Sequence, residues 1–164
     1  MPTIRPASSD DAVFLRTMGV LAAGWRSGAP DEQAIAADPH FGRYIDRWGR
    51  EGDAGVVALE DGRPVGAAWY RFFSADEPGY GFLDRETPEV SIAVDPAFRG
   101  RGVGTALLDA LCERAQRDGL SALSLSVERD NPALRIYERR GFVEVGGTAD
   151  AATMRIDLRR GSDR

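Results

Sequence analysis

The sequence predicts an α/β domain whose central sheet mixes parallel and antiparallel strands. Residues 89–94 read as a strand, and they are followed by a glycine-rich turn, a helical apolar pattern and a second strand-like stretch at residues 122–127. A strand, a helix and a strand in one sheet imply a right-handed parallel crossover. Asp61-Gly62 lies between two apolar runs, which predicts an antiparallel hairpin beside the crossover.

The elements before the hairpin are a short strand and three helical segments. Residues 3–5 predict a strand that ends at Pro6, and the polar residues 8–11 supply N-cap side chains for the first helix. The apolar pattern of that helix consists of Val13, Phe14, Met18, Leu21 and Ala22. Residues 28–30 break the pattern. Residues 31–37 begin a second helix, which Pro39 limits.

Residues 41–48 predict a third helix with aromatic residues on one side. The residues of that side are Phe41, Tyr44, Ile45 and Trp48. A core face explains them, and they are also suited to the wall of an acceptor pocket. The hairpin follows, with strands at residues 55–60 and 64–73, and a polar loop covers residues 74–88.

The second half of the chain continues the alternation of helix and strand. Gly119 predicts the C-cap of the crossover helix, whose apolar face is Val103, Ala106, Leu107, Ala110, Leu111 and Ala115. Asn131 is the expected N-cap of a last helix, with Pro132 at its first position and Gly141 at its end. Residues 142–145 and 153–158 predict a closing antiparallel pair that turns at Gly146-Gly147. The tail from residue 159 is expected to be frayed.

The turn before the crossover helix has the features of an anion site. After Asp95-Pro96 it carries three glycines in five residues, flanked by Arg99 and Arg101, and no acidic residue stands in the first turn of the helix. Glycine allows close approach of a ligand, and the first N–H groups of a helix have no partner within it. A P-loop is excluded because Thr105 and Ala106 follow Gly104, and Thr105 also breaks the dinucleotide fingerprint. A tight turn without a ligand is the alternative.

Composition indicates one soluble domain covering residues 1–164. The hydrophobic content is 43%, the charged content 29% and the net charge −5, which argues against a nucleic-acid surface. Cys112 is the single cysteine and is interpreted as packing, and His40 lacks the partners that a metal site needs. The N-terminus lacks the apolar core of a signal peptide, and no apolar run is long enough for a membrane span. We therefore expect a cytoplasmic protein without membrane or nucleic-acid partners.

Two motifs carry a resemblance to a known family. The spacing Arg99-x-x-Gly102-x-Gly104 resembles the pyrophosphate-binding signature of the GNAT N-acetyltransferase superfamily. The segment from Asn131 to Phe142 resembles a second family motif at Asn131, Tyr137 and Gly141-Phe142, with Ala133 near the family's alanine. The resemblance extends over the whole chain. It implies the GNAT fold, with a mixed central sheet, a V-shaped splay between two parallel strands and helices on both faces.

The resemblance also implies a cofactor site. Acetyl-CoA would lie in the V as cosubstrate, without a metal, and residues 99–104 (the phosphate cradle) would hold its pyrophosphate. The expected cofactor-binding residues are Ile92, Ala93, Val94, Arg99, Gly100, Arg101, Gly102, Val103, Gly104, Thr105, Asn131 and Tyr137. The small strand faces, Ser91 with Ala93 and Ser124 with Ser126, suit a pantetheine arm or equally a solvent-facing side of a sheet. Capping of its own helix would also explain Asn131.

The chemistry of amide formation suggests two catalytic residues. At pH 7, freeing a lysine-like amine of pKa about 10.4 costs roughly 4 to 5 kcal/mol, so a base helps. Glu89, at the start of the strand leading to the cradle, is the candidate base, and a solvated charge is the alternative; Asp84 and Glu86 are weaker candidates. By resemblance Tyr137 is the general acid for the thiolate. A core aromatic is its alternative.

The predicted function is transfer of an acetyl group from acetyl-CoA to a primary amine of a small molecule or peptide. A non-catalytic sensor that binds CoA or acyl-CoA is the alternative, and a homodimer is a further expectation. The acceptor would be set by residues 25–48 and 146–153. The side chains offered there are Trp25, Asp31, Glu32, Phe41, Tyr44 and Trp48. The acidic net charge favours a cationic amine.

Overall fold

The computed structural model describes residues 2–26 and 31–159. The expected break at residues 28–30 and the tail from residue 160 lie outside these ranges. The strands are β1 (Thr3–Pro6), β2 (Ala54–Glu60), β3 (Arg63–Arg71), β4 (Glu89–Val94), β5 (Ala122–Glu128), β6 (Val143–Gly147) and β7 (Ala151–Asp157). The α-helices are α1 (Ala12–Ala23), α2 (Glu32–Ala37), α3 (Pro39–Ile45), α4 (Val103–Arg117) and α5 (Leu134–Arg140), with 3-10 turns η1 (Ser9–Asp11) and η2 (Pro96–Phe98).

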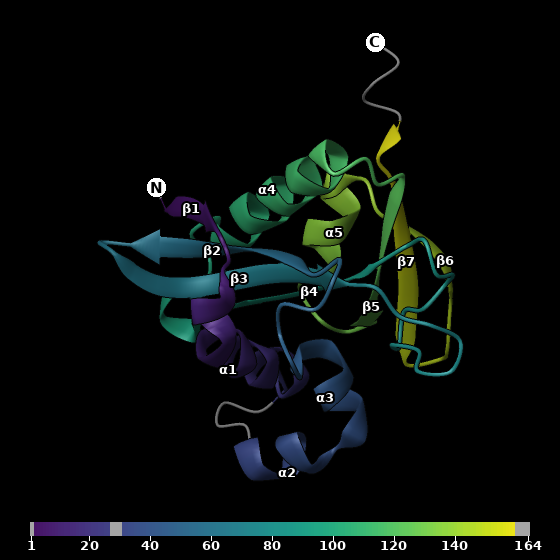
Figure 1. Ribbon diagram of the computed structural model, residues 1–164, viewed down its shortest axis with the longest axis horizontal. Coiled ribbons are helices and arrows are strands. Elements are labelled where there is room, and N and C mark those ends of the chain that lie inside the picture. Colours follow the sequence, from purple (N-terminus) through teal and green to yellow (C-terminus); the bar gives the residue numbers. More distant parts are fainter. Residues whose placement is uncertain (1, 27–30, 160–164) are drawn as a thin grey trace.

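The seven strands form one mixed sheet in the order β1-β2-β3-β4-β5-β7-β6. β4 and β5 are the parallel neighbours, and their register holds one residue pair, Glu89 with Ser124. A hydrogen bond from Ser124 N to Pro88 O, 3.0 Å long, joins the two strands at this same end, where β4 begins. Beyond it the strands diverge, and Figure 1 shows β2 and β3 running in a clearly different direction from β5 and β7. The mixed sheet with a splay between its parallel strands is confirmed.

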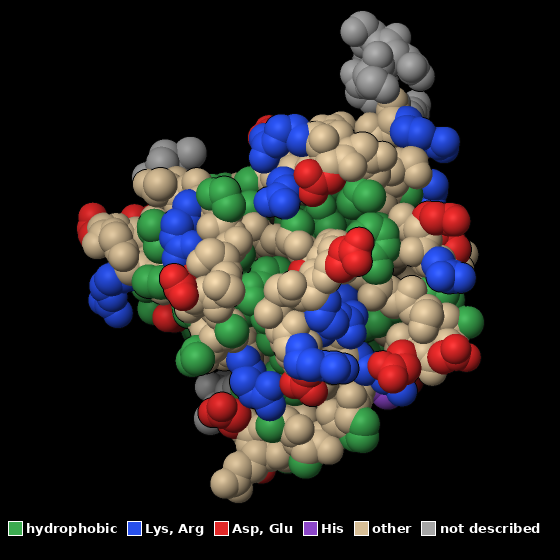
Figure 2. All heavy atoms as spheres, viewed as in Figure 1, with side chains coloured by type: hydrophobic (Ala, Val, Ile, Leu, Met, Phe, Trp, Pro, Cys, Tyr) green, Lys and Arg blue, Asp and Glu red, His purple; other side chains and the backbone are tan. Residues whose placement is uncertain are grey.

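Helices cover both faces of the sheet. In Figure 1, α1, α2 and α3 lie on one side and α4 and α5 on the other. Two apolar clusters result, one between the sheet and α4 and one between the sheet and α1 with α3. On the face shown in Figure 2, arginine side chains alternate with acidic ones. None of the helices in the described part of the chain is both long and apolar enough to span a bilayer.

The crossover helix α4 begins and ends as its sequence indicates. Gly119 has a φ of 80°, Gly119 N donates to Gln116 O at 3.0 Å, and Leu120 N donates to Ala115 O at 3.0 Å. These two bonds are those of a glycine-terminated helix. Cys112 is fully buried in the core, and burial raises the pKa of its thiol to about 11. The thiol therefore stays protonated at neutral pH, in agreement with a packing role.

Two of the N-terminal helices differ from the expected pattern. Val13 is 81% exposed, and the buried positions of α1 are Leu15, Met18, Gly19 and Val20. A 3-10 turn capped by Ser8 precedes α1. α3 runs from Pro39 to Ile45 rather than over residues 41–48, because Asp38 caps it through a bond from His40 N of 2.9 Å. Trp48 lies in the turn beyond the helix.

The expected antiparallel pair at the C-terminus is present, and its turn lies elsewhere than predicted. β7 pairs with both β5 and β6, so it lies between them. The hairpin turns at residues 148–150 instead of Gly146-Gly147, because both glycines are within β6. A register shift between Glu144 and Gly146 accommodates them as a bulge. Thr148 closes the turn, since its N–H donates to Ala151 O at 2.8 Å.

The last helix begins later than its sequence predicts. α5 begins at Leu134, not at Pro132. Asn131 Oδ1 accepts from Ala133 N at 2.9 Å, and Leu134 N donates to Asn131 O at 3.0 Å. These bonds form a separate turn that precedes the helix, so Asn131 caps this turn. Gly141, with a φ of 116°, ends the helix as expected.

Candidate active site

A cleft with a volume of about 1530 Å³ opens between β4 and β5. Pockets for drug-sized ligands usually measure about 300–1000 Å³, so this cleft has room for a large ligand. One wall combines β4, the start of α4 and α5. The other is formed by the end of α1, by α2 and α3, and by the turn between β6 and β7.

The phosphate cradle lies at the start of α4. Gly100 and Gly102 have φ values of 77° and 83°, and a Cβ at either would meet no atom within 4 Å. The first bond of the helix joins Ala106 N to Gly102 O at 3.0 Å. The N–H groups of Val103, Gly104 and Thr105 therefore lack intrahelical partners, and no acidic side chain stands in this turn. The backbone and the helix dipole favour an anion here.

The two arginines of the cradle are placed differently. Arg99 lines the cleft, and its Nε donates to Val94 O at 3.1 Å. This bond joins the cradle to the last residue of β4. The Arg101 guanidinium lies 5.2 Å from the centre of the Phe98 ring. Arg101 is not among the residues that line the cleft.

The strands on either side of the splay contribute small and apolar residues. Ser91, Ile92, Ala93 and Val94 of β4 line the cleft, as does Ser126 of β5. Ser124 does not line it. That side chain is fully buried, and its hydroxyl has no partner among the described residues. Of the two small residues of β5, Ser126 is therefore accessible from the cleft and Ser124 is not.

Asn131 and Tyr137 both line the cleft on the α5 side. Because Asn131 Oδ1 accepts from Ala133 N, the amide donor of this side chain stays available for a ligand. The Tyr137 ring packs edge-on against Phe142 with centroids 6.0 Å apart. Burial raises the pKa of Tyr137 above its ordinary value, so its hydroxyl keeps its proton at neutral pH.

Glu89 lies at the inner end of the cleft and is only 3% exposed. The alternative of a solvated charge is therefore wrong. Oε1 accepts from Gly81 N at 3.0 Å, and Oε2 accepts from the Tyr44 hydroxyl. Burial raises the pKa of Glu89 to about 7, while these two donors lower it. A carboxyl group with this pKa can exchange protons near neutral pH.

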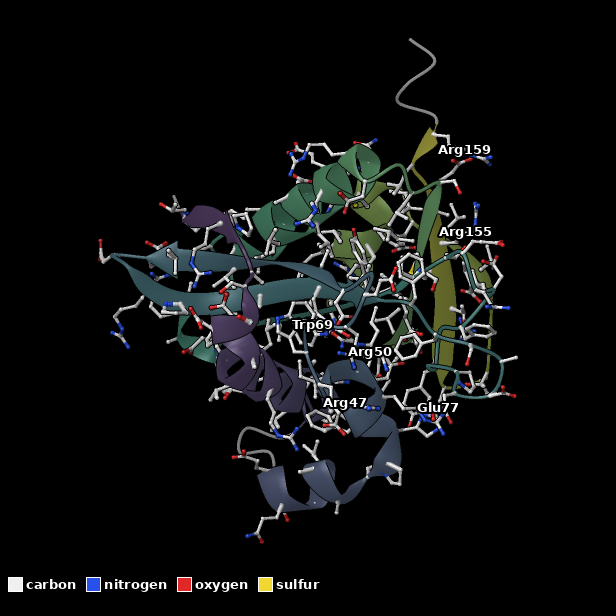
Figure 3. All side chains as sticks on the ribbon, in the orientation of Figure 1. Arg47, Arg50, Trp69, Glu77, Arg155 and Arg159 are labelled. Carbon is white, nitrogen blue, oxygen red and sulfur yellow. The ribbon has the colours of Figure 1, made fainter. Side chains whose placement is uncertain are left out.

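Tyr44 and Tyr80 are cleft residues beside Glu89 whose part sequence reasoning missed. The sequence places Tyr44 among the side chains offered to the acceptor, but it gives no sign of a contact with Glu89, and Tyr80 falls in the polar loop of residues 74–88. Tyr44 O accepts from Trp69 Nε1 at 3.0 Å, and Figure 3 shows Trp69 between the sheet and α3. Nothing in the local sequence links Tyr44 to Glu89, because 45 positions separate them.

The other candidates of the loop and of the acceptor region divide into two groups. Asp84 and Glu86 do not line the cleft, and Asp84 Oδ1 accepts from Glu86 N at 3.0 Å. Trp25, Phe41 and Tyr44 do line it. Asp31, Glu32 and Trp48 are not among its lining residues.

The α1–α3 end of the cleft carries carboxylates and aromatic rings among aliphatic side chains. Asp38 and Glu128 line this end with Trp25, and Asp150 joins them from the turn before β7. Glu128 accepts from Trp25 Nε1 at 3.1 Å and pairs with Arg26 at 2.7 Å. Among the described residues no group of three or more His, Cys, Asp or Glu side chains is placed to hold a metal ion.

The sequence profile of the acetyltransferase (GNAT) family matches residues 21–142, which is most of the chain. The chain belongs to this family. A mycothiol acetyltransferase of Brachybacterium faecium is 41% identical to this GNAT protein over 119 residues, which are 72% of this chain and 34% of that relative. The L-2,4-diaminobutyric acid acetyltransferase of Nocardia farcinica is 39% identical over 82 residues, 48% of this chain and 37% of that protein. This chain thus spans about a third of the length of both.

Solved structures support the same family over nearly the full chain. A GNAT superfamily phosphinothricin acetyltransferase from Sinorhizobium meliloti, in complex with acetyl-CoA, superposes with a TM-score of 0.66 at 25% identity. The match covers 96% of this chain and 88% of that one. The family and the fold predicted from the sequence are confirmed. The open space above Gly102, the free amides of α4 and the size of the cleft fit acetyl-CoA.

Proposed function

We propose that this GNAT protein transfers an acetyl group from acetyl-CoA to a primary amine of a small molecule or peptide. One observation carries the proposal: a buried carboxyl group with a pKa of about 7, Glu89, shares a cleft with the free amides of α4. The first is suited to accept a proton and the second to hold a pyrophosphate. Their arrangement in one cleft is what acetyl transfer to an amine needs.

Different residues of the cleft would bind different parts of acetyl-CoA. The amides of Val103, Gly104 and Thr105 would hold the pyrophosphate, and the free amide group of Asn131 would bind the pantetheine arm. Bound acetyl-CoA supplies the thioester carbonyl carbon that the amine attacks. Ser91 and Ser126 border the space between the strands and are small enough to let the arm lie along the backbone.

Protons move in two places as the N–C bond forms and the C–S bond breaks. Two protons leave the ammonium nitrogen during amide formation. Glu89 accepts one of these protons, directly or through one water, and passes it to solvent, and the other proton is also lost to solvent. Tyr137 donates its phenolic proton to the departing sulfur and regains one from the medium. The net products are the amide, CoA as its thiol and one proton.

The charges at the α1–α3 end favour an acceptor with a second cationic group. Asp38 and Asp150 line that end, whereas Glu128 is already paired with Arg26, and the arginines that line the cleft, Arg99 and Arg139, come from the α4 and α5 side. A carboxylate on the acceptor would be repelled by these two carboxylates, and an ammonium group would be attracted. We place the activity in the cytoplasm as one domain, because the described strands form a single sheet and a free thiol is typical of a reducing compartment.

The decisive test measures CoA release from acetyl-CoA with matched amines. We expect kcat/KM for 1,5-diaminopentane to exceed that for lysine, which differs by one carboxylate. At about pH 7, Glu89→Gln should lower kcat/KM by at least about tenfold, since general base catalysis is typically worth that or more. Glu86→Gln is the matched control, because Glu86 is outside the cleft. Tight binding of acetyl-CoA without CoA release for any amine would contradict catalysis and support a sensor.

A further inference from the structure

We propose that Tyr44 is a positioning residue for the base: its hydroxyl, with the amide of Gly81, holds the Glu89 carboxylate ready to accept a proton from the acceptor. The inference rests on the proposed function, in which Glu89 is the base. Tyr44 lies on α3 and Gly81 in the loop before β4, so two elements outside the sheet hold a side chain that belongs to it.

The direction of the bonds is fixed by the number of protons available. Tyr80 N donates to the Tyr44 hydroxyl oxygen at 2.7 Å. The single proton of that hydroxyl is therefore free to go to Oε2 of Glu89. Gly81 N donates to Oε1 at 3.0 Å. Each carboxylate oxygen thus accepts one bond, an arrangement that favours the ionised form.

Glycines let the loop approach this pair closely. A Cβ at Gly81 would lie 2.6 Å from the carbonyl carbon of Leu125, and a Cβ at Gly79 would lie 2.8 Å from the Tyr44 hydroxyl. The loop therefore packs on β5 on one side and on the Tyr44–Glu89 pair on the other. This contact keeps Glu89 buried and leaves Tyr44 and Gly81 as its two hydrogen-bond donors among the described residues.

The charged groups around Glu89 are engaged elsewhere. Arg71 of β3 is its cross-strand neighbour, but its guanidinium binds Asp53 and the carbonyls of Arg43 and Asp46. Arg43 donates to Pro78 O at 2.8 Å. The β5 neighbour is the neutral Ser124, and α3 and the loop contribute the phenols of Tyr44 and Tyr80. Burial, which raises the pKa of Glu89, is therefore opposed mainly by the bonds from Tyr44 and Gly81.

The test compares Tyr44→Phe with Tyr70→Phe. Tyr70 is a matched control because its hydroxyl donates to a carboxylate, Asp118, at 2.9 Å, in the core on the α4 side and away from the cleft. Both variants lose one phenol-to-carboxylate bond and keep the ring. The quantity to plot is the ratio of wild-type to variant kcat/KM against pH, in which the ionisation of the amine substrate cancels.

For Tyr44→Phe we expect a ratio of about fivefold or more at about pH 6.5 that falls below about twofold at about pH 9, since the base in the variant needs a higher pH to ionise. Tyr70→Phe should give a ratio near one throughout. Titration of the free protein by carboxyl ¹³C NMR, with the Glu89 signal assigned through Glu89→Gln, should show the same upward shift. A ratio for Tyr44→Phe that is independent of pH, or an unshifted Glu89 signal, would overturn the inference.

Measuring Tyr44→Phe in the Glu89→Gln variant distinguishes this inference from the proposed function. If Tyr44 acts through Glu89, Tyr44→Phe should cost less than about twofold when it is added to Glu89→Gln. A full additional loss in that background would overturn the positioning role while leaving Glu89 as the base. If Glu89→Gln alone leaves kcat/KM unchanged at every pH, the base assignment and this inference are both wrong.

Discussion

Arg71 and Asp53 form an ion pair in which each side chain is 1% exposed. Two bonds join them, from Arg71 Nε and Nη2, at 3.0 and 2.9 Å. The remaining nitrogen, Nη1, donates to the backbone carbonyls of Arg43 and Asp46. These two residues bracket the last turn of α3, so the buried pair at the end of β3 fixes the segment that carries Tyr44.

Asp53→Ala should therefore be strongly destabilising. It would leave the Arg71 charge buried without its partner, which typically costs about 3 to 5 kcal/mol. Urea unfolding measures the loss. Glu144→Ala removes the exposed partner of Arg129 and should change the free energy of unfolding by less than about 1 kcal/mol. Equal effects of the two substitutions would mean that the buried pair does not hold α3 in place.

Thr105→Glu should change stability and affinity in opposite directions. Thr105 is exposed in the first turn of α4. A carboxylate there interacts favourably with the helix dipole, by about 0.3 to 1 kcal/mol, and the protein should become slightly more stable. The same charge would repel a bound pyrophosphate, so the Kd for acetyl-CoA should rise at least about tenfold, which is about 1.4 kcal/mol.

Thr105→Gln is the control for this charge, because it has the same shape without the carboxylate. Calorimetry at low and high salt should show a gap between the Glu and Gln variants that narrows as salt screens the charge. If both variants bind acetyl-CoA equally well, no pyrophosphate lies at the start of α4.

Glu89 should also make stability depend on pH. Its pKa in the folded protein is raised to about 7 from the ordinary 4.5. The stability that it contributes is complete below pH 4.5 and is lost as the pH rises through 7, by on the order of 3 kcal/mol. Glu89→Gln removes this dependence. Relative to wild type, the variant should gain stability between about pH 5 and pH 8 in urea unfolding, and a constant difference would contradict the raised pKa.

Tyr137→Phe should separate catalysis from binding. The hydroxyl keeps its proton at working pH because burial raises its pKa. General acid catalysis is worth about a hundredfold or more, whereas one ordinary hydrogen bond contributes about 0.5 to 1.5 kcal/mol. We expect kcat to fall at least about tenfold and the Kd for acetyl-CoA to change less than about threefold. A change confined to Kd would make Tyr137 a cofactor contact.

The glycine turn before α4 was predictable because its information is local. Three glycines, two arginines and a helix start follow one another in the chain, and backbone geometry places their amides together whatever surrounds them. The hairpin at Asp61 is of the same kind, since Asp61 and Gly62 both have positive φ values, of 51° and 79°. Such features depend on a few consecutive residues, which sequence reasoning can assess.

The Tyr44–Glu89 pair was not predictable in this way. Its geometry depends on the end of α3, which depends in turn on the buried pair of Arg71 and Asp53. None of these residues shows its burial in the local pattern. The turn at Gly146 was misplaced for a related reason: glycine marks both turns and bulges, and only pairing with β7 determines which one forms.

The splay between β4 and β5 has a thermodynamic consequence. The two strands share one registered pair, so the four strands from β1 to β4 and the three strands after them are joined at a single point of the ladder. A ligand that bridges both walls would stabilise the folded chain by RT ln(1 + [L]/Kd), about 2.7 kcal/mol at a hundredfold excess over Kd. The melting temperature of the protein would then rise and fall with the concentration of that ligand, and the ligand level would shift the fraction of chains that are folded.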